Sequence, residues 1–155
     1  MIPRRIHAQD PDLPEVLALI RAAFADMEGR IDPPSSMHRL RLSDLAAQCD
    51  TGEIWVLGQP VLASVFLSPR DDVLYLGKLA VAASARRLGL ARDLVALAEM
   101  RARALGLPQI EVQVRVELTE NLVAFQRMGF AQVALTAHPG FDRPTSRTLW
   151  RAVPR

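Results

Sequence analysis

Apolar and polar positions follow three patterns along the chain, and each is typical of a different kind of element. From Ile110 to Val116 they alternate, which predicts a strand with one buried face. From Val73 to Val81 the chain is apolar almost throughout, as expected of a strand covered on both faces. Between these strands, apolar residues recur at helical spacing from Arg86 to Leu105, and Gly106 and Pro108 then end the helix.

The rest of the chain predicts further helices and strands. Asp12 is placed to cap a helix that ends at Gly29, with Pro14 in the first turn and Glu15 in position for a capping box. The other expected elements are strands over 4–8, 53–57, 61–67, 130–135 and 146–151, a helix over 37–48 with a break near Ser43, and a short helix from Thr119 or Asn121 to Met128. The order β-α-α-β-β-β-α-β-α-β-β favours an α+β fold around one mixed sheet.

Composition narrows the class of protein. With 155 residues, half of them hydrophobic, residues 1–155 are expected to form a single domain. No apolar run approaches the length of a membrane span, and no apolar signal core follows the N-terminal arginines. The lone Cys49 excludes an internal disulfide and favours a cytoplasmic location. No cysteine and histidine cluster suggests a metal site.

The charge pattern favours a small anionic ligand over a nucleic acid. The formal charge is only +2 and aromatic residues make up 5 % of the chain, whereas a nucleic-acid surface needs a dense basic face with aromatics. A small polyanion needs only a few arginines in one place. The turn between the strand 73–81 and the following helix has them, namely Arg86, Arg87 and Arg92.

This turn carries the main motif. Backbone N–H groups at the start of a helix have no partner within it and form a ready site for a phosphate. Gly89 and Ala91 leave room for a ligand to approach the backbone. The motif follows the strand end Leu79-Ala80-Val81 and consists of an arginine, two further residues, a glycine, one further residue and a small residue. It resembles the acetyl-coenzyme A motif of the Gcn5-related N-acetyltransferases (GNAT).

A second motif supports the resemblance. The segment 121–130, Asn-Leu-Val-Ala-Phe-Gln-Arg-Met-Gly-Phe, resembles the short helix that borders the thiol end of the cofactor in that family. The resemblance implies a mixed, mostly antiparallel sheet of about six or seven strands flanked by about four helices, with the strands Val73–Val81 and Ile110–Val116 splayed apart. It implies that acetyl-CoA is bound by Leu79, Ala80, Val81, Arg86, Arg87, Leu88, Gly89, Leu90, Ala91, Arg92, Asn121 and Phe125. Gly77 fits a bulge or a close approach in the first of these strands.

The sequence departs from the family pattern at three places. Phe125 stands where many members have a tyrosine whose hydroxyl can protonate the departing thiolate. Either another group or water supplies that proton, or acid catalysis contributes little. Ala83 replaces a common proline and Ala91 a frequent second glycine, and both changes should matter little.

Candidate catalytic residues each have an ordinary alternative. Glu111 and Glu117 on the polar face of the strand 110–116 are candidates for the general base, or are solvated surface glutamates. His138 titrates near neutral pH and is a third candidate, or a turn residue without a role. Lys78, the only lysine, either forms a structural salt bridge or serves the site. Tyr75 is expected to be a half-buried core residue, with contact between its hydroxyl and the substrate as the alternative.

Two loops are candidates for the acceptor side. The segment 32–36 is placed where the family builds an acceptor wall, and Asp142 with Arg143 is a second candidate. We therefore expect an acetyl-CoA-dependent N-acetyltransferase acting on a primary amine of a small molecule or peptide. A non-catalytic acyl-CoA-binding module and a transferase using a longer acyl-CoA are the alternatives. No nucleic-acid or membrane partner is expected, and a homodimer through the terminal strands is compatible with the family.

Overall fold

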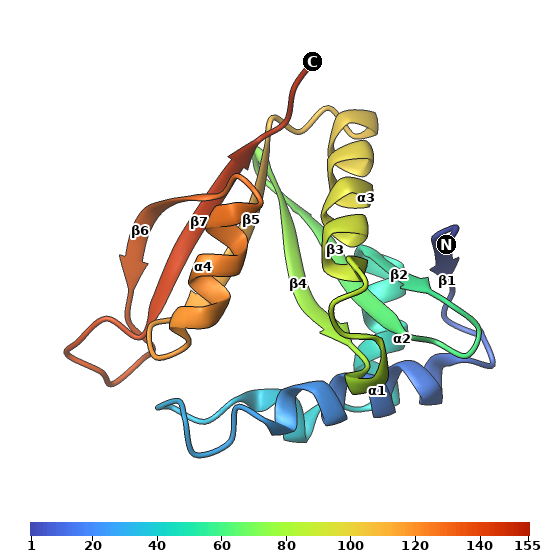
Figure 1. The fold of residues 1–155 in the computed structure, drawn as a ribbon, viewed down its shortest axis with the longest axis horizontal. Helices are drawn as coiled ribbons and strands as arrows, with labels where there is room; N and C mark the ends of the chain where they lie inside the picture. Colours follow the sequence, from blue (N-terminus) through green and yellow to red (C-terminus); the bar gives the residue numbers. More distant parts are fainter.

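Seven strands form one sheet in the computed structural model, which describes residues 1–155 (Figure 1). Their order is β1-β2-β3-β4-β5-β7-β6; β4 and β5 are parallel, and all other neighbours are antiparallel. The mixed, mostly antiparallel sheet expected from the sequence is therefore confirmed. The strands are β1 (Arg4–Ile6), β2 (Glu53–Leu57), β3 (Ala63–Arg70), β4 (Val73–Val81), β5 (Gln109–Arg115), β6 (Ala131–Thr136) and β7 (Ser146–Ala152).

Helices cover both faces of this sheet. They are α1 (Leu13–Ala25), α2 (Leu42–Thr51), α3 (Leu90–Ala104) and α4 (Thr119–Arg127), with short 3₁₀ turns η1 (Ser36–Arg39) and η2 (Ala83–Ala85). Alternate residues of β3 divide the core between the faces. Val65 and Leu67 join the apolar cluster under α3, whereas Phe66 joins the cluster under α1 and α2. None of the helices has the length and apolar content that crossing a bilayer requires.

The two parallel strands separate after a short contact. β4 pairs with β5 only where Val73, Leu74 and Tyr75 face Gln109, Ile110 and Glu111. Beyond these pairs the strands diverge, and Figure 1 shows them as the two arms of a V. The splay expected between Val73–Val81 and Ile110–Val116 is present, and it leaves one edge of β4 without a strand partner.

A bulge bends β4 inside the V. Gly77 pairs with Phe66 and Ala80 with Ser64, so Lys78 and Leu79 both lie opposite the single residue Val65. Lys78 has a φ of 50°, a left-handed conformation that is uncommon for a residue with a side chain. Gly77 itself is needed for a close approach, because a Cβ there would lie 2.8 Å from the ring of Tyr75. The bulge expected at Gly77 is therefore centred on the following two residues.

Some local expectations differ from the structure. Asp12 is the N-cap residue of α1, but its side chain forms no capping hydrogen bond, and its carboxylate accepts a hydrogen bond from Arg4 instead. Glu15 accepts the backbone N–H of Val61 rather than forming a capping box. The helix expected from Arg86 begins at Leu90, because Gly89 adopts a φ of 78°. The break in the segment 37–48 falls between η1 and α2, before Ser43.

Candidate active site between the splayed strands

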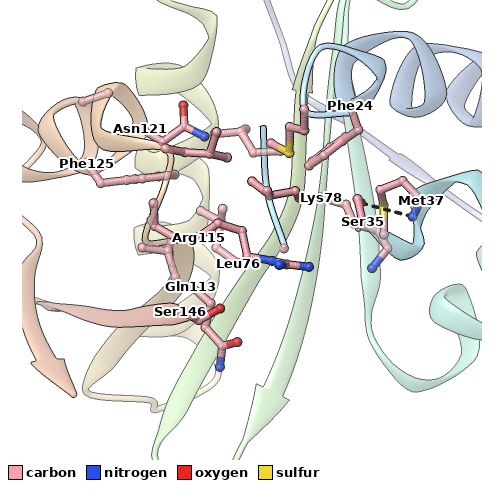
Figure 2. Close-up of a pocket in the computed structure, with 18 of the residues that line it drawn as sticks. Phe24, Ser35, Met37, Leu76, Lys78, Gln113, Arg115, Asn121, Phe125 and Ser146 are labelled. Atoms are coloured by element: carbon pink, nitrogen blue, oxygen red, sulfur yellow. Dashed lines mark hydrogen bonds between the residues drawn. The ribbon is translucent and has the colours of Figure 1, made fainter. Parts of the chain in front are cut away.

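A cavity of about 440 Å³ fills the open part of the V. Residues 75–79 of β4 and 112–115 of β5 form two walls. α4 contributes Asn121, Ala124, Phe125 and Met128, and the segment after α1 contributes Ile31, Ser35, Ser36 and Met37. Figure 2 shows Asn121 and Phe125 on one side of this space and Phe24, Lys78, Ser35 and Met37 on the other. The expected acceptor wall at 32–36 does border the cavity, through its two serines.

The free edge of β4 runs along the cavity. Leu79 is one of the residues that line it. Ala80 is 1 % exposed and packs in the cluster on the α1 side, and Val81 pairs with Ala63 of β3. Ala80 and Val81 therefore offer backbone groups, rather than side chains, to anything bound beside the strand.

The turn after β4 presents unpaired backbone donors. The N–H groups of Arg86, Arg87, Leu88 and Gly89 donate no hydrogen bond to another backbone group of the protein. The first N–H groups of α3, from Leu90 to Arg92, are also left free by helix geometry. Ala91 lines the cavity, so the turn and the cavity are continuous. Donors that point outward at a helix start form a site for an anion.

The arginines of this turn are accessible. Arg86, Arg87 and Arg92 are exposed, and Arg86 pairs with the exposed carboxylate of Asp26 at 3.0 Å. Leu88 is also exposed. The side chains expected to contact phosphates are therefore accessible to a ligand. Arg86 would have to give up its ion pair with Asp26 to bind one.

The second motif also borders the cavity. Asn121 and Phe125 project from the same face of α4 into it. The ring of Phe125 packs edge-on against Phe130, with 5.4 Å between centroids, and Phe130 is 3 % exposed. The helix is held in place by this aromatic pair, and no hydroxyl stands at position 125.

The three candidate proton-transfer residues lie in different places. His138 lines the cavity; its backbone N–H donates to Oγ1 of Thr145 at 2.8 Å, and its Nδ1 lies 2.5 Å from the same oxygen. Burial, and then the charge of Arg115, lower the pKa of His138. The ring is therefore held in one orientation and favoured in its neutral form.

The two glutamates are separated by the divergence of the strands. Glu117 follows the open end of β5 and accepts the backbone N–H of Asp32 at 3.0 Å through Oε2, while its Oε1 is buried without a partner. Glu111 lies at the closed end of the V, opposite Tyr75, and accepts a hydrogen bond from Nε1 of Trp150 at 2.8 Å. Neither glutamate lines the cavity itself. Glu117 lies near its rim, where its charge acts on the pKa of His138, whereas Glu111 lies at the closed end of the V.

Two cations face the cavity. Lys78 lies over the ring of Phe66, with Nζ 5.5 Å from the centroid, and no carboxylate approaches it within salt-bridge distance. The structural salt bridge considered for Lys78 is therefore not formed. Burial, and then the charge of Arg70, lower the pKa of this ammonium, against an opposing effect of Asp44.

Arg115 was not singled out by the sequence. Its Nη1 donates to the carbonyl of Pro33 at 2.7 Å, and burial lowers its pKa. Figure 2 shows its guanidinium reaching from β5 into the space between the walls. The sequence signal that could have found it is its place on the same face of the strand as Glu111 and Glu117. That pattern does not reveal at which end of β5 the strands diverge and the cavity lies.

Two other candidates are settled by their positions. Tyr75 lines the cavity and packs under Arg70, whose guanidinium carbon lies 4.0 Å from the ring centroid, and burial raises its pKa. Asp142 and Arg143 are exposed and do not line the cavity; Arg143 instead pairs with Asp32 at 2.9 Å. No group of three or more metal-ligating side chains is found.

Comparison with known proteins identifies the family. Residues 17–130 match the family described as "Acetyltransferase (GNAT) family". An acetyltransferase of the GNAT family from Staphylococcus aureus Mu50 has a similar structure, with a TM-score of 0.74 at 14 % identity, over 99 % of this chain and 100 % of that one. An acetyltransferase from Streptococcus agalactiae 2603 gives 0.74 at 19 % identity, over 97 % of each chain.

A third neighbour is a larger protein. N-acetylglutamate synthase from Neisseria gonorrhoeae, solved with coenzyme A and N-acetyl-glutamate, gives a TM-score of 0.72 at 19 % identity, over 100 % of this chain and 36 % of that one. These structures share the fold, and a search among curated proteins found no match. Because the family match spans most of the chain and includes both motifs up to Phe130, the protein belongs to the GNAT family of acetyltransferases.

Proposed function

We propose that the protein is an acetyl-CoA-dependent N-acetyltransferase that acylates a primary amine of a small molecule or peptide. One observation carries this proposal. The unpaired edge of β4 leads without interruption into a turn whose N–H groups have no backbone partner. An extended arm ending in a pyrophosphate is complementary to such an edge and turn.

The residues present fit coenzyme A. The backbone of Leu79, Ala80 and Val81 would hold the pantetheine arm as an added strand. The segment Arg86 to Arg92 would hold the phosphates through N–H groups and arginine side chains. Asn121 and Phe125 would border the thiol. When bound, acetyl-CoA supplies the activated acyl group.

The protein must then position an amine and move its proton. The cavity brings the amine beside the thioester, which replaces a bimolecular encounter by a fixed geometry. We assign the stabilisation of negative charge on the carbonyl oxygen to a backbone N–H near Leu79 to Val81. Glu117 and His138 lie on the open side, where an attacking amine must lose a proton, and we assign proton transfer to them, directly or through water. Glu111 stays a candidate whose test is given below.

A non-catalytic acyl-CoA-binding module is the alternative that one observation favours. Position 125 borders the cavity and has no hydroxyl to protonate a thiolate. A transferase using a longer acyl-CoA is compatible with the small Ala124 in the same wall. We also propose a homodimer through the terminal strands and a cytoplasmic location.

The first test is a thermal titration of the protein with acetyl-CoA, with adenosine as the control. A ligand at about 100 times its Kd adds about 2.7 kcal/mol to stability. For a chain of this size that is a rise in Tm of roughly 5–10 °C. A saturable rise with acetyl-CoA alone supports the cofactor site; no rise at millimolar acetyl-CoA overturns the proposal.

Variants then separate the enzyme from the binder. With an amine panel and detection of released thiol, E117Q and H138Q are each expected to lower kcat by about 100-fold, the usual scale of general acid–base catalysis, with little change in the acetyl-CoA shift. E111Q should change kcat by less than about threefold, because Glu111 is bonded to Trp150 at the closed end of the V. A large loss with E111Q and none with E117Q would reverse the assignment. Absence of thiol release from every amine would favour the binding module.

A further inference from the structure

The lining of the cavity has an unbalanced charge. It contains the basic side chains of Lys78 and Arg115 beside the imidazole of His138, whose neutral form is favoured, but no aspartate and no glutamate. Cavities that accept polycationic amines need carboxylates to receive them, whereas this one would repel a second positive charge. The charge of the acceptor must therefore be complementary to a cationic cavity.

Lys78 is the first of two basic side chains in the lining, and it has no ion-pair partner. It is half-buried, its bulge holds it at a φ of 50°, and no carboxylate oxygen approaches it within 4 Å. The charged groups that face it are Arg70, which disfavours its charge, and Asp44, whose carboxylate already accepts the backbone N–H of Arg41 at 2.8 Å. A half-buried ammonium without a counterion is costly unless a bound anion relieves it.

Arg115 stands on the opposite wall. Two proline carbonyls, of Pro33 and Pro34, orient its guanidinium from the loop after α1. The nearest acidic groups, Glu117 and Asp32, form no ion pair with it, because Asp32 pairs with Arg143 and Glu117 accepts the N–H of Asp32. Its remaining donors are free for a planar anion such as a carboxylate.

We propose that the acceptor is an amine that also carries a carboxylate, held by Lys78 and Arg115 while its amino group faces the thioester. The inference rests on the proposed function and specifies its substrate class. Ser35 and Ser36 also line the cavity, and their hydroxyl groups supply further hydrogen-bond donors for the carboxylate. Polyamines and amines with added positive charge are excluded by the same argument.

Matched acceptors test the proposal. Thiol release is measured for a set of amino acids, for their amides and for the amines that lack the carboxyl group. The wild type is expected to prefer the carboxylates by at least about tenfold in kcat/KM, the value of one charge-assisted hydrogen bond. In K78M and R115M this preference should fall below about threefold, whereas K78R should retain most of it.

Controls separate this inference from the proposed function. R143Q removes an exposed cation that does not line the cavity and should leave the preference unchanged. The acetyl-CoA thermal shift is measured for every variant, and K78M and R115M should keep it. If neutral amines react as well as carboxylates, or if both cavity variants keep the preference, the carboxylate inference is overturned while the enzyme stands. If the wild type shows neither a shift nor thiol release, the proposed function itself fails.

Discussion

Position 125 determines which proton donors the cavity can offer. Phe125 borders the cavity and packs against Phe130, so a ring of the same shape fits there. F125Y adds one hydroxyl beside the expected thiolate with little change in packing. We expect kcat to rise about tenfold, below the usual contribution of a general acid, because the thiolate is already a tolerable leaving group.

Steady-state kinetics with thiol detection measure this effect. Thermal unfolding should show that F125Y and the wild type have the same stability to within about 1 kcal/mol. An unchanged or lower kcat in a stable F125Y protein would show that protonation of the thiolate does not limit the reaction.

A second residue-scale prediction concerns a structural ion pair far from the cavity. Arg101 donates to both carboxylate oxygens of Glu53 at 2.8 Å, and Nε1 of Trp55 donates to Oε1 at 2.8 Å. Burial alone would raise the pKa of Glu53, but the hydrogen bonds from Arg101 and Trp55 outweigh it, and the pKa is lowered from its ordinary value of 4.5. R101M leaves a carboxylate buried without its cation and should cost about 3 kcal/mol at pH 7.

The pH dependence follows from the sign of that shift. A carboxyl group whose folded pKa is depressed stabilises the fold fully above its unfolded pKa and loses this contribution as the pH falls through the folded value. In R101M burial is no longer outweighed by Arg101, so the folded pKa of Glu53 rises above 4.5. The difference in urea stability between the wild type and R101M should therefore be largest near pH 7, begin to shrink above pH 4.5 and keep shrinking as the pH falls through the depressed folded pKa of the wild type. R103M, on the exposed side of α3, is the control and should cost less than about 1 kcal/mol. A pH-independent difference would contradict the electrostatic origin.

Among single residues, the sequence identified several that line the cavity. It missed residues that reach the cavity only because distant segments come together in the fold. Asn121, Phe125 and His138 all line the cavity. Arg115 was missed because the alternation along β5 shows which residues share a face of the strand. It does not show at which residue β4 and β5 diverge. The separation of Glu111 from Glu117 has the same cause.

At the scale of elements, Gly89 determines how the turn meets α3. Its φ is 78°, and a Cβ there would contact nothing within 4 Å, so alanine fits the free protein and adds only conformational strain. G89A should lower stability by about 1 kcal/mol. In addition, we expect it to weaken acetyl-CoA binding by at least about tenfold, since the new methyl group disturbs N–H groups aimed at an anion.

Gly106 supplies the matched control for this change. It follows the other end of α3 with a φ of 73° and equally open space around its missing Cβ. G106A should therefore lose similar stability and bind acetyl-CoA normally. Calorimetric titration and urea unfolding compare the two, and equal affinities would show that the turn is not the phosphate site.

The strands were predicted more closely than the helix starts. β2 and β4 match their expected ranges, because continuous apolar segments end at clear turns. The start of α3 was placed too early, since Arg87 and Gly89 adopt positive φ and helical spacing does not report backbone handedness. The bulge expected at Gly77 is centred on Lys78 and Leu79 for the same reason, because no local sequence rule places a lysine at positive φ.

At the scale of the whole molecule, the two arms of the sheet are joined by few strand contacts. Three residue pairs hold β4 to β5 at the closed end, and the apolar cluster under α3 spans the junction. Motif order and the alternation of elements predicted this architecture. The loop contacts that complete the cavity, such as Asp32 with Glu117 and Arg143, join segments far apart in the sequence and could not be predicted.

This architecture predicts where a bound ligand protects the backbone. The N–H groups on the unpaired edge of β4 and in the turn from Arg86 to Arg92 lack a strand partner, so they should exchange rapidly in the free protein. Acetyl-CoA should slow exchange in residues 76–92 by at least about tenfold, because it supplies acceptors for these donors and links the arms of the V. β6, an exposed edge strand whose only partner is β7, is the internal control and should exchange equally with and without ligand. Hydrogen exchange followed by mass spectrometry, with adenosine as the ligand control, measures both segments. Protection spread evenly over the chain would indicate general stabilisation, whereas protection of β6 alone would place the ligand outside the V.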